Sequence, residues 1–266
     1  MGGLCLEDRI KSIQFARTCR EEWPVATFVV AHGAWSAGWA WKKMHPLMAA
    51  RGHALVTPTC TGLGERAHLA HPDLDLEAHV TDMLAVLACE DLTGIILVGH
   101  SYGGMVATLV AARAPDRVAA LVYVDAFAPK DGESVFSLTP ERRVSMGELA
   151  RQHGGFIPPQ AMPPDTAPDD LAWASPRRRP QPLKTFEQAA RLPREPAMPR
   201  HYVYCTRHPP DDRFRQFYER ARREGWRHYE IDASHNPHIT CPQTLADLFD
   251  AIAIAESARQ SGMSFP

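Results

Sequence analysis

The sequence predicts an α/β protein whose central parallel sheet is covered by helices on both faces. Short runs of apolar and β-branched residues alternate along the chain with segments in which apolar residues recur at helical spacing. Such alternation is typical of strand–helix–strand units with right-handed crossovers, which place neighbouring strands in parallel. The run "GIILVGH", residues 94–100, is apolar almost throughout, which indicates a strand buried on both faces.

The first half of the chain supplies four expected strands and the helices between them. The strands are "ATFVVAHGAW", "HALVTPT", "GIILVGH" and "RVAALVYVDAF". Apolar residues at helical spacing follow the first strand from Trp39 to Met48 and the second from Leu76 to Leu87, and "SYGGMVATLVAARAP" follows the third. Each strand is thus joined to the next by a helical crossover.

The alternation stops near Phe127 and resumes at residue 200. Between them the chain is rich in Pro, Arg and Asp, and an insertion of this length is usually a lid or a binding loop. The strand "HYVYCT", the helix "DRFRQFYERARREG", the strand "WRHYEID" and the helix "PQTLADLFDAIAIA" complete the pattern. We expect a core of residues 25–127 and 200–266, a cap of residues 128–199, and an N-terminal extension of residues 1–24 whose role the sequence does not reveal.

Composition narrows the function classes. The formal net charge of -2 predicts no nucleic-acid partner and no anionic membrane. The six cysteines lie far apart, without the spacing of a zinc site or a disulfide framework, which favours a reducing cytoplasm. No apolar run approaches the ~20 residues that span a bilayer. We therefore expect a cytoplasmic protein with no metal, and the sequence leaves a homodimer open beside a monomer.

Gly99-His100-Ser101-Tyr102-Gly103 is a G-x-S-x-G motif between an expected strand and an expected helix. In that context the serine sits on a strained turn, and flanking glycines relieve crowding around its exposed hydroxyl. The motif alone also fits a glycine-rich turn with an inert serine. A phosphate-binding loop is disfavoured because no Lys-Ser/Thr follows and no GxGxxG is present.

A serine nucleophile needs a base, and the chain has 13 histidines to choose from. His235 in "DASHNPH" follows the last expected strand, and reactive groups of open α/β sheets gather at the carboxyl ends of strands. His238, three residues later, is the alternative. Backbone donors for a developing oxyanion are expected from the N–H groups of Tyr102, next to the nucleophile, and Ala34, in the turn "HGAW" after the first strand.

Several stretches together resemble the α/β-hydrolase superfamily, and more narrowly its branch of plant methylesterases, hydroxynitrile lyases and small bacterial esterases. The matching stretches are "FVVAHGAWSAGWAW", "TPTCTGLGERAHL", "LVGHSYGGMV", "LVYVDAFAPKDGES", "WASPRRRPQPLKTF" and "SHNPHITCP". The resemblance implies a six-stranded, mainly parallel sheet flanked by helices, a small cap after the fourth strand, and Ser-His-acid hydrolysis without a cofactor.

Two departures from that branch bear on the reaction. Its lyases carry Thr where this chain has Gly33, and Lys directly after the catalytic histidine, where this chain has Asn236. The absence of both favours ester hydrolysis over cyanohydrin cleavage.

The acid is the third departure. Plant members place it two residues past a Thr after the next-to-last strand, where this chain has His208. Asp125 ends the fourth strand, on the edge where a carboxylate could orient the histidine, and some α/β-hydrolases take their acid there. We predict Asp125 as the acid, with Asp211 as the alternative, and Asp212 as the N-cap of the following helix.

The sequence therefore predicts a carboxylesterase with Ser101 as nucleophile, His235 as base and Asp125 as acid. Its expected partner is a small to medium organic ester, cleaved through an acyl-enzyme intermediate. A lyase, a cofactor-free oxygenase and a non-catalytic ligand receptor on the same fold are the alternatives. Candidate pocket side chains are Trp35, Trp39, Trp173, Phe127 and Phe136.

Overall fold

The predicted fold is confirmed by the computed structural model, which describes residues 25–208 and 212–261. Six strands form one sheet in the order β2-β1-β3-β4-β7-β8, and all neighbours are parallel. The strands are β1 (Thr27–Ala31), β2 (Ala54–Val56), β3 (Ile95–His100), β4 (Val118–Val124), β7 (Arg200–Cys205) and β8 (Arg227–Ile231). The expected extension, residues 1–24, lies outside the described residues.

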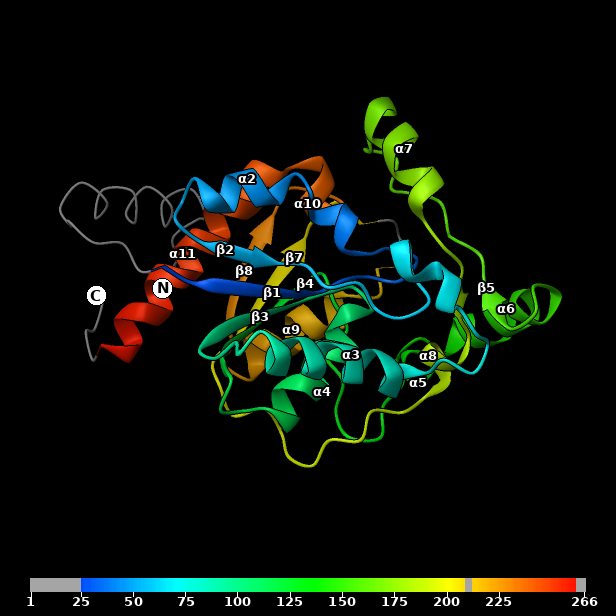
Figure 1. Cartoon of the computed structure of the whole chain (residues 1–266), viewed down its shortest axis with the longest axis horizontal. Helices are drawn as coiled ribbons and strands as arrows, with labels where there is room; N and C mark the ends of the chain where they lie inside the picture. The colour runs from blue at the N-terminus through cyan, green and yellow to red at the C-terminus, as the bar shows by residue number, and fades with distance from the viewer. Residues whose placement is uncertain (1–24, 209–211, 262–266) are drawn as a thin grey trace.

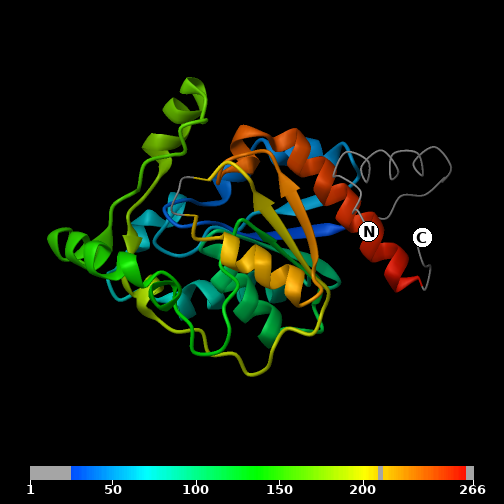
Figure 2. The same ribbon diagram turned by 180° about the vertical axis from the view of Figure 1, so that it is seen from behind.

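Helices cover both faces of the sheet (Figures 1 and 2). One face carries α2 (Met44–Ala49), α10 (Pro237–Thr240) and α11 (Pro242–Gln260), and the other carries α3 (Leu76–Cys89), α4 (Gly103–Arg113) and α9 (Arg215–Arg223). Side chains of β1 alternate between two buried clusters: Val29 packs on the α3–α4 side, and Phe28 and Val30 on the α2–α11 side. The sheet thus separates two apolar cores.

The connection after β1 differs from the expected single helix. A short 3-10 turn, Gly38–Trp41, precedes α2, which begins only at Met44. Pro46 has no N–H to donate, which suits the first turn of a helix and not its interior. A second 3-10 turn, Gly64–Leu69, follows β2.

Close packing brings α4 directly beneath the carboxyl ends of β1 and β4. Every residue of β3 is buried, and so are the first ten residues of α4. A Cβ on Gly104 would lie 1.9 Å from the carbonyl oxygen of Phe127, so only glycine allows this approach. The start of α4, and the turn that leads into it, is therefore held firmly against the sheet edge.

The part of the segment 128–199 from α5 (Val135–Leu138) to α8 (Lys184–Glu187) lies beyond the carboxyl ends of the strands, and the chain then runs back to the amino end of β7 (Figure 1). Between these two helices are α6 (Pro140–Gln152), β5 (Phe156–Ile157), α7 (Pro168–Ala174), the 3-10 turn Ser175–Arg177 and β6 (Gln181–Pro182). Trp35 ties this segment to the core: its backbone N–H donates to Gln181 Oε1 at 3.1 Å and its indole N–H to the carbonyl oxygen of Ile157 at 2.9 Å. The division into core and cap at residues 128 and 199 stays a prediction.

The described part of the chain contains no helix that is both long and apolar enough to cross a membrane. Its four cysteines, Cys60, Cys89, Cys205 and Cys241, are free. Burial raises the pKa of the Cys60 and Cys205 thiols, so both stay protonated near neutral pH. Across residues 25–208 and 212–261, no group of three or more His, Cys, Asp or Glu side chains is arranged to hold a metal ion.

Candidate active site

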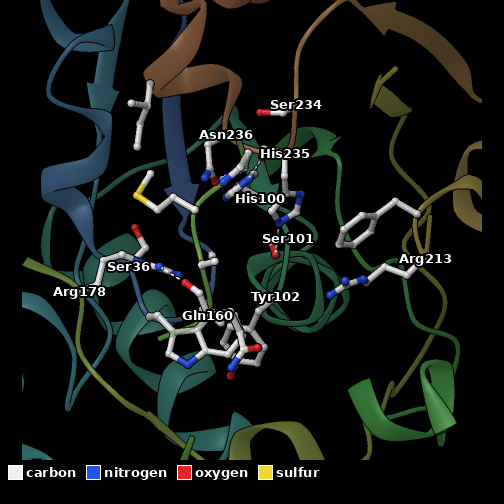
Figure 3. A pocket seen from close by; sticks show the side chains of 18 of the residues that line it. Ser36, His100, Ser101, Tyr102, Gln160, Arg178, Arg213, Ser234, His235 and Asn236 are labelled. Carbon is white, nitrogen blue, oxygen red and sulfur yellow. Dashed lines mark hydrogen bonds between the residues drawn. The ribbon is translucent and has the colours of Figure 1, made fainter. Parts of the chain in front are cut away.

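Ser101 occupies the tight turn between β3 and α4, with its side chain directed into a pocket (Figure 3). Its φ of +55° lies in the left-handed region, which costs a non-glycine residue about 1 kcal/mol or more. A Cβ on Gly103 would come 2.0 Å from the carbonyl oxygen of Ala31, so glycine is required there. The strained turn is thus enforced by packing and lifts the serine hydroxyl above the sheet.

His235 follows β8 and lies within hydrogen-bond distance of Ser101. Its Nε2 is 2.8 Å from Ser101 Oγ, and its Nδ1 is 2.6 Å from Asp125 Oδ2. The ring of Phe214 stacks on the imidazole at 4.8 Å, and His100 Nε2–H donates to the carbonyl oxygen of His235 at 2.7 Å. These contacts hold the ring between serine and carboxylate, although 30% of its side chain is exposed.

His100 is a neutral donor in that contact. Burial and, to a smaller extent, the charge of the neighbouring His235 lower its pKa to about 3. The imidazole ring of His100 also favours glycine at position 33, because a Cβ on Gly33 would lie only 2.8 Å from His100 Nδ1. His100 therefore acts as a fixed support beneath the loop of His235.

Asp125 directly follows β4 and is fully buried. Its φ of +44° is also in the left-handed region. Of the three hydrogen-bonded side chains, Ser101 and Asp125 therefore belong to residues with a strained backbone. Oδ2 accepts from His235, and Oδ1 accepts from His208 at 3.0 Å and from the N–H of Cys205 at 3.3 Å. Burial by itself would raise the pKa of Asp125, but the hydrogen bonds from His208 and His235 outweigh it and lower the pKa. The carboxylate is therefore ionised near neutral pH.

His208 is the site residue whose role the sequence analysis missed. Its side chain is 8% exposed, and its Nδ1 lies 3.7 Å from Asp212 Oδ1 while its Nε2 binds Asp125. Burial alone would lower the pKa of His208, but the hydrogen bond to Asp125 and the charges of Asp125 and Asp212 raise it. The signal was present: once the acid is assigned to the end of β4, a histidine at the vacated acid position faces it.

The alternative candidates lie elsewhere. His238 stacks on Trp41 at 4.5 Å, and burial lowers its pKa well below the usual value. Asp211 lies outside the described residues. The predicted N-cap role of Asp212 is wrong in position, because Phe214 is the N-cap of α9. Asp212 lies two residues before that N-cap. Its Oδ1 accepts from the N–H groups of Phe214 at 3.0 Å and Arg215 at 3.1 Å.

Ala34 and Tyr102 both line the pocket beside Ser101. Within the described residues, neither backbone N–H donates a hydrogen bond to any acceptor. The next residue, Trp35, has a φ of +60°, and its own N–H is used by Gln181. Two unengaged donors therefore flank the serine from the ends of β1 and β3, as an oxyanion site requires.

The pocket has a volume of about 680 Å³ and an apolar wall. Of the aromatic side chains expected to line it, Trp35, Trp39 and Phe127 do so. Trp173 and Phe136 are instead backing residues: Trp173 packs on Trp39 at 5.2 Å and Phe136 on Phe186 at 5.8 Å. Polar lining comes from Ser36, Gln160, Ser234, Asn236 and four arginines.

Comparison with known proteins places this geometry in context. Residues 28–248 match the sequence profile described as the alpha/beta hydrolase family. A carbendazim hydrolyzing esterase from Nocardioides is 33% identical over 247 residues, which cover 86% of this chain and 100% of the relative. A pyrethroid hydrolase from Sphingobium wenxiniae is 33% identical over 129 residues, 48% of this chain and 43% of the relative.

Among solved structures, an extracellular alpha/beta-hydrolase from a Paenibacillus species superimposes with a TM-score of 0.73. Its sequence is 25% identical, and the match covers 84% of this chain and 97% of that one. That protein is described as sharing structural and functional homology with tobacco salicylic acid binding protein 2.

Proposed function

The chain belongs to the alpha/beta hydrolase family, and from this premise we propose that it is a serine hydrolase that cleaves carboxylic esters through an acyl-enzyme intermediate. It is an enzyme, and the names of its relatives support ester hydrolysis in general. The observation that carries the finer proposal is the placement of His235, 2.8 Å from Ser101 Oγ and 2.6 Å from Asp125.

In the first half of the reaction, Ser101 Oγ attacks the carbonyl carbon of the ester while His235 Nε2 takes its proton. The carbonyl electron pair moves onto the oxygen, which accepts from the N–H groups of Ala34 and Tyr102. When the tetrahedral intermediate collapses, the imidazolium returns the proton to the leaving alcohol. The acyl group stays on Ser101.

In the second half, His235 removes a proton from a water molecule as its oxygen attacks the acyl carbon. The second tetrahedral intermediate releases Ser101 Oγ, which regains its proton from His235. One ester and one water thus yield one acid and one alcohol. Asp125 stays ionised throughout, which fixes the tautomer of His235 and stabilises the imidazolium.

Two features of the pocket support this reaction. Its volume of about 680 Å³ suits small to medium organic esters. Asn236, directly after His235, lines the pocket and cannot supply the ammonium charge that the lyases of the resembled branch carry there. Cytoplasmic location and homodimer formation stay predictions.

The test is turnover of p-nitrophenyl acetate and butyrate by the wild type and by Ser101→Ala. We expect clear turnover by the wild type and a loss of about 10⁴-fold or more in the variant, because no other group replaces the nucleophile. Ser145→Ala, an exposed serine on α6, is the matched control and should behave as wild type. Equal turnover by Ser101→Ala and wild type would contradict the proposal.

A further inference from the structure

Among the described residues, the Asp, Glu, Lys and Arg side chains that line the pocket all carry positive charge. They are Arg142, Arg178, Arg207 and Arg213, and no described Asp or Glu is among the lining residues. This contrasts with the whole chain, whose formal net charge is -2. A cleft with walls of one charge concentrates field lines and attracts ligands of the opposite charge.

Arg178 is a half-buried pocket arginine without a carboxylate partner among the described residues. Within the described residues no carboxylate lies within 4.0 Å of its guanidinium. One of its terminal N–H groups donates to the carbonyl oxygen of Gln160, and its Cζ lies 5.8 Å from the ring of Trp35. Burial alone lowers its pKa, as expected for a cation removed from water without an anion beside it.

The arginines next to Arg178 in the sequence, and Arg207 in the pocket lining, form hydrogen bonds with other partners. Arg177 donates to the carbonyl oxygen of Trp173 and is exposed, and Arg179 donates to Pro176 at 2.9 Å. Arg207 forms two hydrogen bonds of 2.7 Å with Asp232. In Figure 3 Arg178 points into the pocket from the side of Gln160, and Arg213 points into it from the opposite side.

We propose that Arg178 binds a carboxylate of the substrate, so that the preferred esters carry an anionic group besides the ester bond. The inference rests on the proposed function, because it names the substrate class of the same site. A guanidinium has five N–H donors, of which the structure uses one for Gln160. The remaining donors match the two oxygens of a carboxylate, and a bound anion would neutralise the uncompensated charge.

The experiment compares pairs of esters in which a carboxylate of one ester is replaced by a neutral group in the other. On the acyl side, the mono-p-nitrophenyl esters of glutaric and adipic acid are compared with p-nitrophenyl pentanoate and hexanoate, which have the same numbers of acyl carbons. On the alcohol side, 4-acetoxybenzoate is compared with 4-acetoxybenzamide. For each pair the ratio of kcat/KM, charged over neutral, is measured after subtraction of uncatalysed hydrolysis.

We expect wild type to prefer the charged ester of at least one pair by about tenfold or more, since hydrogen bonds between charged groups are the strong ones. Arg178→Gln should bring that ratio to 1 or below, and Arg178→Lys should give an intermediate ratio. Arg177→Gln, the exposed neighbour, is the matched control and should leave the ratio unchanged. Because the ratio is taken within one variant, general damage to the enzyme cancels.

Two outcomes overturn the inference while the proposed function stands: Ser101-dependent turnover without preference for any charged ester, or a preference that survives in Arg178→Gln. If no ester is hydrolysed, the proposed function fails, and calorimetric titration with glutarate then decides for Arg178 alone. Binding that is at least tenfold tighter to wild type than to Arg178→Gln would support the anion site, and equal or absent binding would overturn it.

Discussion

Strand β7 connects two histidine–carboxylate clusters at opposite edges of the sheet. His201, the second residue of β7, pairs with Glu256 at 3.1 Å. His208, three residues after the end of β7, pairs with Asp125 at 3.0 Å. Both clusters use the same side-chain chemistry, and both carboxylates are buried. The two clusters differ in whether the histidine can reach a nucleophile and a substrate.

The cluster at the amino edge is closed. The side chains of His201 and Glu256 are 0% and 3% exposed. Glu256 also accepts from Arg227 and Arg259, each at 2.8 Å, and the second nitrogen of His201 lies 3.3 Å from the hydroxyl of Tyr229. Burial by itself would raise the pKa of Glu256, but these partners lower it to about 2. Every polar atom is directed at another structural group.

The cluster at the carboxyl edge is open on one side. Asp125 is held by His208 and His235, but the second nitrogen of His235 faces the hydroxyl of Ser101 over a pocket. A histidine–carboxylate pair is therefore a candidate for catalysis only where the far nitrogen meets a nucleophile and substrate can enter. The residue types alone do not distinguish the two clusters, whereas the sheet edge does.

Asp125→Asn should have the largest effect, because it breaks the open cluster. Asparagine can occupy the same volume, but it carries no charge to stabilise the imidazolium and can hold His235 in the wrong tautomer. We expect kcat for p-nitrophenyl butyrate to fall about 10⁴-fold. Circular dichroism should show a folded protein, and a kcat within tenfold of wild type would remove Asp125 from the proposed triad.

Glu256→Gln should break the closed cluster. We expect it to lower stability and leave kcat nearly unchanged, in contrast to Asp125→Asn. His201, Arg227 and Arg259 would lose the buried anion they surround, so we expect the free energy of unfolding to fall by about 3 kcal/mol. The kcat of the folded enzyme should stay within twofold of wild type. Urea unfolding and ester turnover check the two values, and a large loss of kcat without a loss of stability would reverse the comparison.

The difference in unfolding free energy between wild type and Glu256→Gln should depend on pH, because the pKa of Glu256 is lowered in the folded protein. A carboxylate with a depressed folded pKa stabilises the fold above its ordinary pKa of 4.5, and this contribution is lost as the pH falls towards about 2. The gap in unfolding free energy between wild type and Glu256→Gln should therefore be full at pH 7 and smaller at pH 3. A gap that is constant with pH would show that the charge of Glu256 is not its source.

His208→Ala should lower turnover far less than Asp125→Asn, because His208 acts through Asp125 as a positioning residue. Loss of one hydrogen bond from a charged donor should lower kcat about tenfold. The hydrogen bond from His208 and its charge both lower the pKa of Asp125, so without them the acid limb of the kcat/KM profile should move to higher pH by up to about one unit.

His208→Gln separates the two roles of that side chain. Glutamine retains an N–H donor but not the charge, so we expect kcat to recover most of its wild-type value while the acid limb stays shifted. A purely structural role would lower stability and leave the limb where it is in wild type. Lower stability together with an unchanged acid limb, in both His208→Ala and His208→Gln, would contradict the positioning role.

Much of the core could be predicted because its signals are local. The all-apolar run of β3 marks a strand buried on both faces, and the glycines around Ser101 mark the turn into α4. Asp125 and His235 could both be assigned to the carboxyl edge, because each follows a strand and all strands are parallel. Strand order then brings together residues 110 positions apart.

The remaining features depend on the path of irregular chain. The contact between His208 and Asp125 depends on the loop after β7, and the sequence indicates it only after the acid has been assigned to the end of β4. Arg178 follows a 3-10 turn in the segment 128–199, where the sequence "RRR" gives no sign of which arginine enters the pocket. Trp173 was a candidate for the pocket wall on residue type, but Trp39 stands in front of it.

If the open cluster makes Ser101 a nucleophile, covalent labelling should detect the activated hydroxyl. A fluorophosphonate reacts with an activated serine: a bond forms between Oγ and phosphorus, fluoride leaves, and the base takes the hydroxyl proton. Intact-mass spectrometry should show one adduct on wild type, mapped to the peptide that contains Ser101, and the same labelling rate for Glu256→Gln. Asp125→Asn should label far more slowly, and Ser101→Ala not at all. An adduct on another residue, or equal labelling of Ser101→Ala, would contradict the account.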